Sequence, residues 1–314
     1  MANMADAVSL VETRRTARHR RFPRINWLAL AMIMPSVIAL LLIGLYPLLF
    51  AVSLSFQRFL LNRPQNNGMF VGFENYAKVL EDPLFWSSLG RTLTMLLIVL
   101  IIQIIAGIGI ALLVDSSRWR VLNWVVKTVL VIPIAMTPAV VGLLGVLIFN
   151  RDFGLMNYLL GLIGIEKINW LGDPTMAMAA IIITDIWQWT PFAALIMLSS
   201  LALVPHDMIE AAKLDTKSGW MIFRYVKLPY LMPGITAFMI IRTADVLKLF
   251  DMPFTLTRGG PGVSTELISL YVQRMGFRIF DMGVASAQAV LLLILCIVLA
   301  RAYIYFFYRA PEAE

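Results

Sequence analysis

Long apolar runs without charged residues are the feature that most constrains how this chain can fold. Residues 92–114 form an uncharged run of 23 residues, and residues 282–300 form another of 19. A helix that crosses the hydrocarbon core of a bilayer needs about 20 predominantly apolar residues. Only 14% of the chain is charged, whereas soluble domains carry roughly 25%. The sequence therefore predicts an all-α, polytopic membrane protein.

Six such runs predict six transmembrane helices. They are residues 27–56, 92–114, 128–149, 174–202, 233–252 and 282–300. The first run is longer than the apolar core of a secretory signal, so we expect an uncleaved first helix. The predicted organisation is a basic tail over residues 1–26, a membrane domain over residues 27–308 and a short tail over residues 309–314.

Lysine and arginine residues are distributed unevenly between the segments that flank these helices. With the N-terminus in the cytoplasm, 15 of them fall on cytoplasmic segments and 9 on external segments. Positive residues accumulate on the cytoplasmic side of membrane proteins. We therefore expect both termini in the cytoplasm, and we attribute the net charge of +7 to topology and not to nucleic-acid binding.

The first external loop, residues 57–91, is long and rich in aromatic residues. We expect it to form short helices that lie on the membrane. It would serve either as a lid over the bundle or as part of a surface for an extracytoplasmic partner.

Residues of the kinds that bind metals or nucleotides are scarce. The chain has one cysteine, Cys296, and two histidines, His19 and His206, so we expect no internal disulfide and no cysteine–histidine metal site. The glycine-rich motif that cradles nucleotide phosphates is missing from the sequence. We predict no catalytic residue, no metal and no cofactor bound by this chain. Any uphill transport must take its energy from a partner or an ion gradient.

Residues 204–232, which we call the polar segment, are too charged for lipid and too regularly patterned for a slack connector. Residues 207–214 are predicted to form a short helix that Pro205 opens. Ser218 is predicted to cap a second helix that runs to about Val226, because bulky residues recur there at helical spacing. Two short helices on the face of a membrane bundle indicate a surface that binds a separate protein.

The polar segment contains a motif that resembles the EAA loop of bacterial ABC importer permeases. Its residues are Glu210, Ala211, Ala212, Asp215 and Gly219, followed by Phe223, Val226, Leu228, Pro229 and Pro233. The family usually has glycine directly after the aspartate, where this chain has Thr216, and we expect Gly219 to supply the flexibility instead. Outside the polar segment, residues 70–76, 187–192 and 242–262 resemble the carbohydrate-importer branch, the maltose and glycerol-phosphate type.

This resemblance implies the permease subunit of a type I importer for a sugar, polyol or sugar derivative, in the plasma (inner) membrane of a bacterium. The implied partners are a second homologous permease, two ATPase subunits and an extracytoplasmic solute-binding protein, with membrane lipid around the bundle. The ATPase subunits hydrolyse ATP with Mg²⁺, and transport proceeds by alternating access. The resemblance makes the polar segment a cytoplasmic loop with a coupling helix that enters a cleft of an ATPase subunit. Glu210 is expected to pair there with an arginine, and the small Ala211 and Ala212 allow close approach.

Four charged residues on the fifth predicted helix alternate in sign at steps of three. They are Arg242, Asp245, Lys248 and Asp251. Neighbours three apart share one helix face and can pair, and the cost of facing lipid, at least ~2.5 kcal/mol for each charge, turns them toward the bundle or water. The set forms either a structural polar seam or a lining of the translocation pathway. We assign Arg242 and Asp245 to the pathway, and Lys248 and Asp251 to the outer surface.

A second polar cluster lies on the fourth predicted helix. Its residues are Asp185, Trp187, Gln188 and Trp189. Indole rings stack on the apolar faces of sugars, and carboxylates and amides bind sugar hydroxyls, so we also assign this cluster to the substrate pathway. Ordinary packing is the alternative, because Trp187 and Trp189 are two positions apart and cannot point the same way.

Two other functions stay open on the residues alone. One is an ion-coupled secondary transporter that uses Asp185 or Asp245, although we find no paired repeats of the kind common in such folds. The other is a membrane enzyme acting on lipid, against which the small number of histidines argues.

Overall fold

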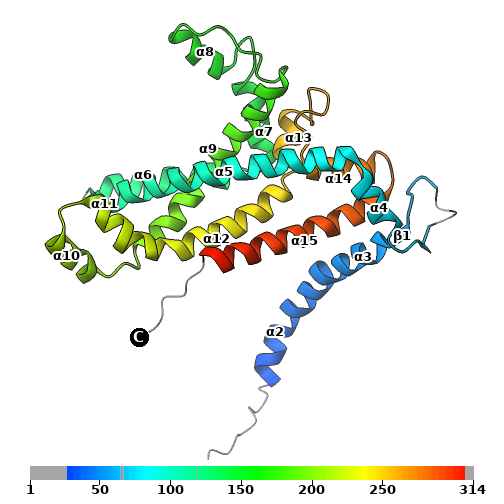
Figure 1. Cartoon of the computed structure of the whole chain (residues 1–314), viewed down its shortest axis with the longest axis horizontal. Coiled ribbons are helices and arrows are strands. Elements are labelled where there is room, and N and C mark those ends of the chain that lie inside the picture. The colour runs from blue at the N-terminus through cyan, green and yellow to red at the C-terminus, as the bar shows by residue number, and fades with distance from the viewer. Residues whose placement is uncertain (1–26, 64, 66, 118, 308–314) are drawn as a thin grey trace, which may run out of the picture. The chain divides into compact units, whose positions relative to one another are not determined.

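The structure is a computed structural model that describes residues 27–307 apart from 64, 66 and 118. The described chain is mostly helical and contains one two-stranded sheet (Figure 1). The described residues separate into two units, with the boundary between Phe50 and Ala51. The prediction of an all-α membrane protein is confirmed.

The first unit holds the first apolar helix. It consists of α2 (Trp27–Leu40), the π-helical turn η1 (Leu41–Leu45) and the start of α3 (Tyr46–Ser55). The stretch Leu30–Ser55 is long and apolar enough to cross a membrane. Most of its large apolar side chains are exposed, for example Ile43 at 78%. A helix surface of this kind suits lipid or another protein chain.

Four helices of the second unit are also long and apolar enough to cross a membrane. They are α5 (Pro83–Ser116), α9 (Pro174–Leu201), the helix Gly219–Leu247 that ends in α12 (Leu228–Leu247), and α15 (Met282–Phe307). α5 packs along α9, and α12 packs against both α9 and α15, so the four form one bundle (Figure 1). At Gly107 on α5, an added Cβ atom would lie only 2.7 Å from the Cβ of Ala193 on α9.

The third apolar run is broken into two helices, which corrects the prediction of one span over residues 128–149. These helices, α6 (Arg120–Ala135) and α7 (Pro138–Ile148), are bent by 96° at the break. A proline drives the residue before it away from helical backbone, and Thr137 is extended, with ψ 142°. By length and composition, the described residues contain five membrane-crossing helices, or six if the bent pair is one span.

The polar segment begins with the predicted short helix, α10 (His206–Asp215), but its second helix runs without a break into the fifth span. α11 (Gly219–Ile222), the π-helical turn η3 (Phe223–Lys227) and α12 form one continuous helix. The prediction that the fifth span starts near Pro233 is therefore wrong. Pro229 lacks an N–H group and crowds the carbonyl four residues back. The wider π turn ends at Lys227, two residues before this proline, and contains that carbonyl.

The fifth span also ends earlier than predicted, at Leu247 and not near Met252. Lys248 has left helical geometry, with φ −102° and ψ 4°, and Asp251 begins the separate helix α13 (Asp251–Leu256). α13 packs on α7. A Cβ atom at Gly142 of α7 would overlap the side chain of Thr255 on α13, so the bend before α7 leads to a close helix contact.

The loop over residues 57–91 differs from the predicted set of short helices. It contains the antiparallel strands β1 (Gln57–Arg58) and β2 (Met69–Phe70), followed by the single helix α4 (Glu74–Glu81). From Pro83 onward the chain already belongs to α5. Asp82 caps that helix by accepting a hydrogen bond from the N–H of Leu84 at 2.9 Å.

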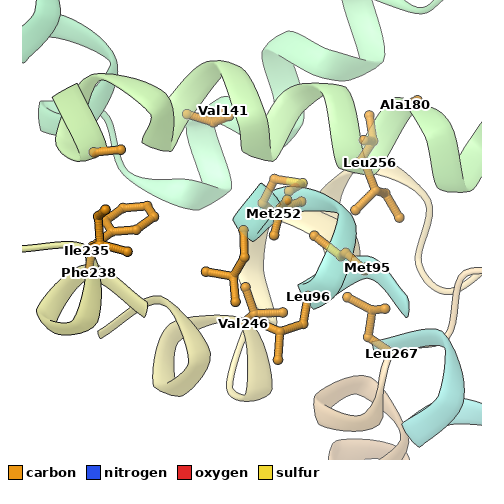
Figure 2. Close-up of a cluster of buried hydrophobic side chains, with 14 of the residues drawn as sticks. Met95, Leu96, Val141, Ala180, Ile235, Phe238, Val246, Met252, Leu256 and Leu267 are labelled. Carbon is orange, nitrogen blue, oxygen red and sulfur yellow. The ribbon is translucent and has the colours of Figure 1, made fainter. Parts of the chain in front are cut away.

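The largest buried apolar cluster joins α5, α7, α9, α12 and α13. Figure 2 labels ten residues of this cluster: Met95, Leu96, Val141, Ala180, Ile235, Phe238, Val246, Met252, Leu256 and Leu267. Apolar side chains gain little by leaving lipid, so close packing between helices, and not the hydrophobic effect, holds such a bundle together.

Residues 150–173, which we call the external arm after their predicted side of the membrane, stand apart from the four long helices in Figure 1 and contain α8 (Leu155–Leu162). The side chain of Asn157 holds the arm together. Its Nδ2 donates to the carbonyls of Arg151 at 3.0 Å and Ile168 at 2.9 Å. Its Oδ1 accepts from Nε1 of Trp170 at 3.0 Å.

We expect the substitution Asn157→Ala to loosen the external arm. It leaves buried polar groups of the arm without a partner, at a cost of about 1–3 kcal/mol for each group. Because each 1.4 kcal/mol changes an equilibrium tenfold, limited proteolysis within the arm should become about tenfold faster. Glu166→Ala, at an exposed position of the same arm, is the control. Equal cleavage rates in the two variants would contradict this role of Asn157.

Candidate functional site

The polar segment presents α10 with all its side chains accessible. Glu210 and Ala211 are exposed and Ala212 is half-buried, and the helix has no buried residue. Close to them, Leu214 is 90% exposed and Trp220 is 70% exposed. Large apolar side chains gathered beside charged ones outside the bundle are typical of a surface that binds another protein.

The turn after α10 is built by two hydroxyl groups between Asp215, which ends α10, and Gly219, which begins α11. Thr216 Oγ1 accepts from the N–H of Ser218 at 3.1 Å, and Ser218 Oγ accepts from the N–H of Met221 at 3.4 Å. The predicted cap at Ser218 is therefore confirmed. Thr216 is extended, with φ −147°, a conformation that needs no glycine. This explains how the turn tolerates threonine at that position.

An ion pair fastens the polar segment to the end of α5. Lys227 Nζ lies 2.7 Å from Asp115 Oδ2, and both side chains are partly exposed. The two residues are 112 positions apart, so sequence reasoning missed the pair. The contact links the base of the α11–α12 helix to a second membrane helix.

Inside the bundle, a buried polar network joins three helices. Arg242 on α12 donates to Asp185 on α9 at 2.6 Å, and to Oε1 of Gln103 on α5 at 3.2 Å. Gln103 Nε2 also donates to Asp185 Oδ1 at 2.9 Å. The side chains of Arg242 and Asp185 are 1% and 0% exposed. Gln103 was not predicted, although an amide inside the uncharged run 92–114 is the sequence signal that could have found it.

The tryptophans of the predicted cluster point in different directions, as their spacing requires. Trp187 is 49% exposed, whereas the guanidinium carbon of Arg242 lies 4.7 Å from the ring centroid of Trp189. Gln188 is buried and donates to the carbonyl of Met136 at 3.2 Å. The structure therefore brings Asp185, Trp189 and Arg242 together and leaves Trp187 outside that group.

The predicted charge ladder pairs at its first two steps. Arg242 Nη1 lies 4.0 Å from Asp245 Oδ2, and Lys248 Nζ lies 3.0 Å from Asp245 Oδ1. Lys248 is 74% exposed and Asp245 is 23% exposed, and Asp251 is exposed at the start of α13. Asp185 and Arg242 are enclosed in this conformation, whereas Asp245 has accessible surface. Their assignment to the substrate pathway stays a prediction.

Further polar contacts involve α14 (Ile268–Phe277), which packs against α5. Tyr271 donates to the Asp82 carboxylate, and burial together with that carboxylate raises the pKa of Tyr271. Glu266 pairs with Arg274 at 2.9 Å. Burial raises the pKa of Glu266, and the positive charge of Arg274 opposes this shift.

These features define a class of protein. The fold is similar to the solved structure of a bacterial ABC transporter involved in the import of the acidic polysaccharide alginate. The TM-score is 0.78, with 21% identity over 91% of this chain and 96% of that chain. A helical membrane bundle that presents an EAA-like helix beside it is the architecture of an ABC transporter permease. Among the described residues, no group of three or more His, Cys, Asp or Glu is placed to hold a metal.

The particular family follows from the sequence. The profile of the family described as binding-protein-dependent transport system inner membrane component matches residues 103–311, and the chain belongs to this family. It is therefore a transport component of the inner membrane and not an enzyme.

Similar proteins cover almost the whole chain. A probable ABC transporter permease of Sinorhizobium fredii is 33% identical over 95% of this chain and 95% of its own length. The sulfoquinovosyl glycerol transport system permease of Agrobacterium fabrum is 34% identical over 88% of this chain and 89% of its own. The trehalose/maltose transport system permease of Thermococcus litoralis is 32% identical over 87% of this chain and 91% of its own.

Proposed function

We propose that this permease moves a sugar, a polyol or a sugar derivative into the cytoplasm as part of an ATP-driven importer. The observation that carries the proposal is the similarity, above 30% identity, to permeases named for sulfoquinovosyl glycerol and for trehalose and maltose. A binding-protein-dependent family implies that a separate solute-binding protein delivers the cargo. An alginate transporter solved with its sugar-loaded periplasmic protein shares the fold, with a TM-score of 0.76.

The proposed assembly contains this chain, a second homologous permease, two ATPase subunits and the solute-binding protein. ATP and Mg²⁺ are bound and hydrolysed by the ATPase subunits. α10 enters a cleft of one ATPase subunit, where Glu210 pairs with an arginine. Closure of the ATPase subunits pushes the coupling helices together and opens the bundle outward, and reopening after hydrolysis releases the solute inside.

Within the bundle, we place solute contact at Trp189 and Asp245 first, because both contact Arg242 and both have partly exposed side chains. Trp187 is exposed but lies outside this group, and we place it second. The buried residues of the set hold Trp189 and Asp245 in position in this proposal. They are Asp185, Gln188 and Arg242. Lys248 and Asp251 lie at the outer surface in this proposal.

Purification of the tagged chain from its host membrane tests the assembly. We expect a nucleotide-hydrolysing subunit and a second permease to accompany it, and we expect ATP-dependent sugar uptake in proteoliposomes supplied with the binding protein. Absence of an ATPase from the purified material, or uptake driven by an ion gradient alone, would contradict the proposal.

The proposed orientation is tested by cysteine labelling. In a Cys296→Ser background, Leu214→Cys should react with a membrane-impermeant maleimide only after spheroplasts are opened. Glu166→Cys in the external arm should react in intact spheroplasts, because the arm lies on the opposite side. Labelling of Leu214→Cys before opening would place the polar segment outside the cell and refute the proposed function.

A further inference from the structure

Arg242 and Asp185 form an ion pair that is fully enclosed between α12 and α9. The guanidinium and the carboxylate approach to 2.6 Å, and their side chains are 1% and 0% exposed. Replacing a buried ion pair by well-packed apolar residues is often neutral or stabilising. Stability alone therefore gives a weak reason for two charges at this place in a membrane bundle.

Each of the two charges has a second polar neighbour. Nη1 of Arg242 lies 4.0 Å from Asp245, one turn along its own helix, and its guanidinium also covers the ring of Trp189. Asp185 Oδ1 accepts from Gln103. Among the described residues, the other oxygen of Asp185 is buried without a hydrogen-bond partner. The contact between the helices can therefore break without leaving either charge alone in an apolar interior.

The helix that carries Arg242 continues to the polar segment. It is helical from Gly219 to Leu247, so at 1.5 Å per residue Arg242 lies about 35 Å along the same helix from Gly219. A displacement of α11, which begins this helix, can therefore reach Arg242 along one continuous helix. The ammonium group of Lys248 lies 3.0 Å from Asp245, and its side chain is 74% exposed. Water can therefore solvate the ammonium group when Lys248 releases the Asp245 carboxylate.

We propose that Arg242 is a positioning residue of the transport cycle that exchanges its carboxylate partner. It binds Asp185 when α9 and α12 are closed together, as here. It transfers to Asp245 when the two helices separate. This inference rests on the proposed function, because the separation is driven by the ATPase subunits.

If Arg242 exchanges its partner, three variants should shift the equilibrium between the closed and separated arrangements of α9 and α12. Asp185→Asn weakens the closed arrangement and favours separation. Lys248→Gln leaves Asp245 free for Arg242 and also favours separation. Asp245→Asn removes the second partner and favours the closed arrangement. A purely structural role would not give Asp185→Asn and Asp245→Asn opposite effects.

The test measures the distance between α9 and α12 in the assembled complex. Spin labels at Ile183→Cys and Ile241→Cys, both at exposed positions, are placed in a Cys296→Ser background. Pulsed electron resonance then records distances without nucleotide and after trapping with ATP and vanadate. We expect Asp185→Asn and Lys248→Gln to raise the separated fraction without nucleotide at least threefold. We expect Asp245→Asn to lower the separated fraction in the trapped complex at least threefold.

A control variant and the two variants at accessible positions make the result decisive. Asp152→Asn, the same charge change at an exposed position of the external arm, should leave both distances unchanged. Lys248→Gln and Asp245→Asn alter accessible side chains, so they decide the question if Asp185→Asn does not assemble. If Lys248→Gln and Asp245→Asn shift the separated fraction in the same direction, or leave it unchanged, the exchange is overturned. The nucleotide response of the unaltered complex would then still support the proposed function. A complex with no ATPase activity and no nucleotide response would overturn both.

Discussion

The substitution Glu210→Arg is expected to reduce uptake and solute-stimulated ATP hydrolysis to background while the permease still reaches the membrane. Glu210 is exposed on α10, which has no buried residue, so the change leaves the packing of the bundle intact. In the proposed complex it replaces a charge-assisted pair by two like charges in a protein cleft. Losing one partner of such a pair costs about 2–5 kcal/mol, which corresponds to a loss of binding of roughly thirtyfold or more. The measurements are uptake into proteoliposomes, ATPase activity and the amount of ATPase subunit that copurifies.

The control for this prediction is Glu166→Arg, the same substitution at an exposed site of the external arm. It should leave the amount of copurifying ATPase unchanged. A Glu210→Arg permease that retains its ATPase subunits and transports at the unaltered rate would show that α10 does not couple the two proteins through this carboxylate.

The short helices of the polar segment were predictable from the sequence because the charge of this segment differs from that of its surroundings. Charged residues at helical spacing stand out within a chain that is otherwise apolar, and Pro205 and Ser218 mark the starts of the two short helices. The continuity of the second helix into the fifth span was not predictable. Pro229 and Pro233 suggested a break, and the π turn at Phe223–Lys227 that lets the helix continue has no comparable sequence signal.

For the buried polar network inside the bundle, the sequence revealed the charged residues but not how they pair. Each charge was visible in the sequence as an anomaly in an apolar helix, but its partner was not. The sequence suggested Asp245 for Arg242, because the two are three residues apart. The closer contact is with Asp185, 57 positions away, and only the packing of α9 against α12 brings these two together. The same pairing gives Asp185 an arginine partner, which argues against the alternative of an ion-binding site at this carboxylate.

The structure also shows which small residues lie at contacts between helices, and sequence periodicity cannot predict this. In the sequence, most of α5 is an uncharged run that contains two glycines, Gly107 and Gly109. Gly107 is buried against α9, whereas Gly109, two positions later, is exposed and has nothing within 4 Å of its Cβ position. One glycine is therefore required for helix packing and the other is not.

The substitution Gly107→Leu is consequently expected to prevent stable folding of the permease. Even the first added carbon would lie 2.7 Å from the Cβ of Ala193 and 3.0 Å from its backbone carbon, and a backbone cannot yield as a flexible side chain does. Overpacking costs about 1–3 kcal/mol where the neighbours can shift, and close approach at small residues is what holds membrane helices together. We expect at least a tenfold loss of detergent-stable protein in a thermal solubility assay. Gly109→Leu, with the same change in volume on the same helix, should match the unaltered chain, and equal losses in both variants would show that the α5–α9 contact is not the reason.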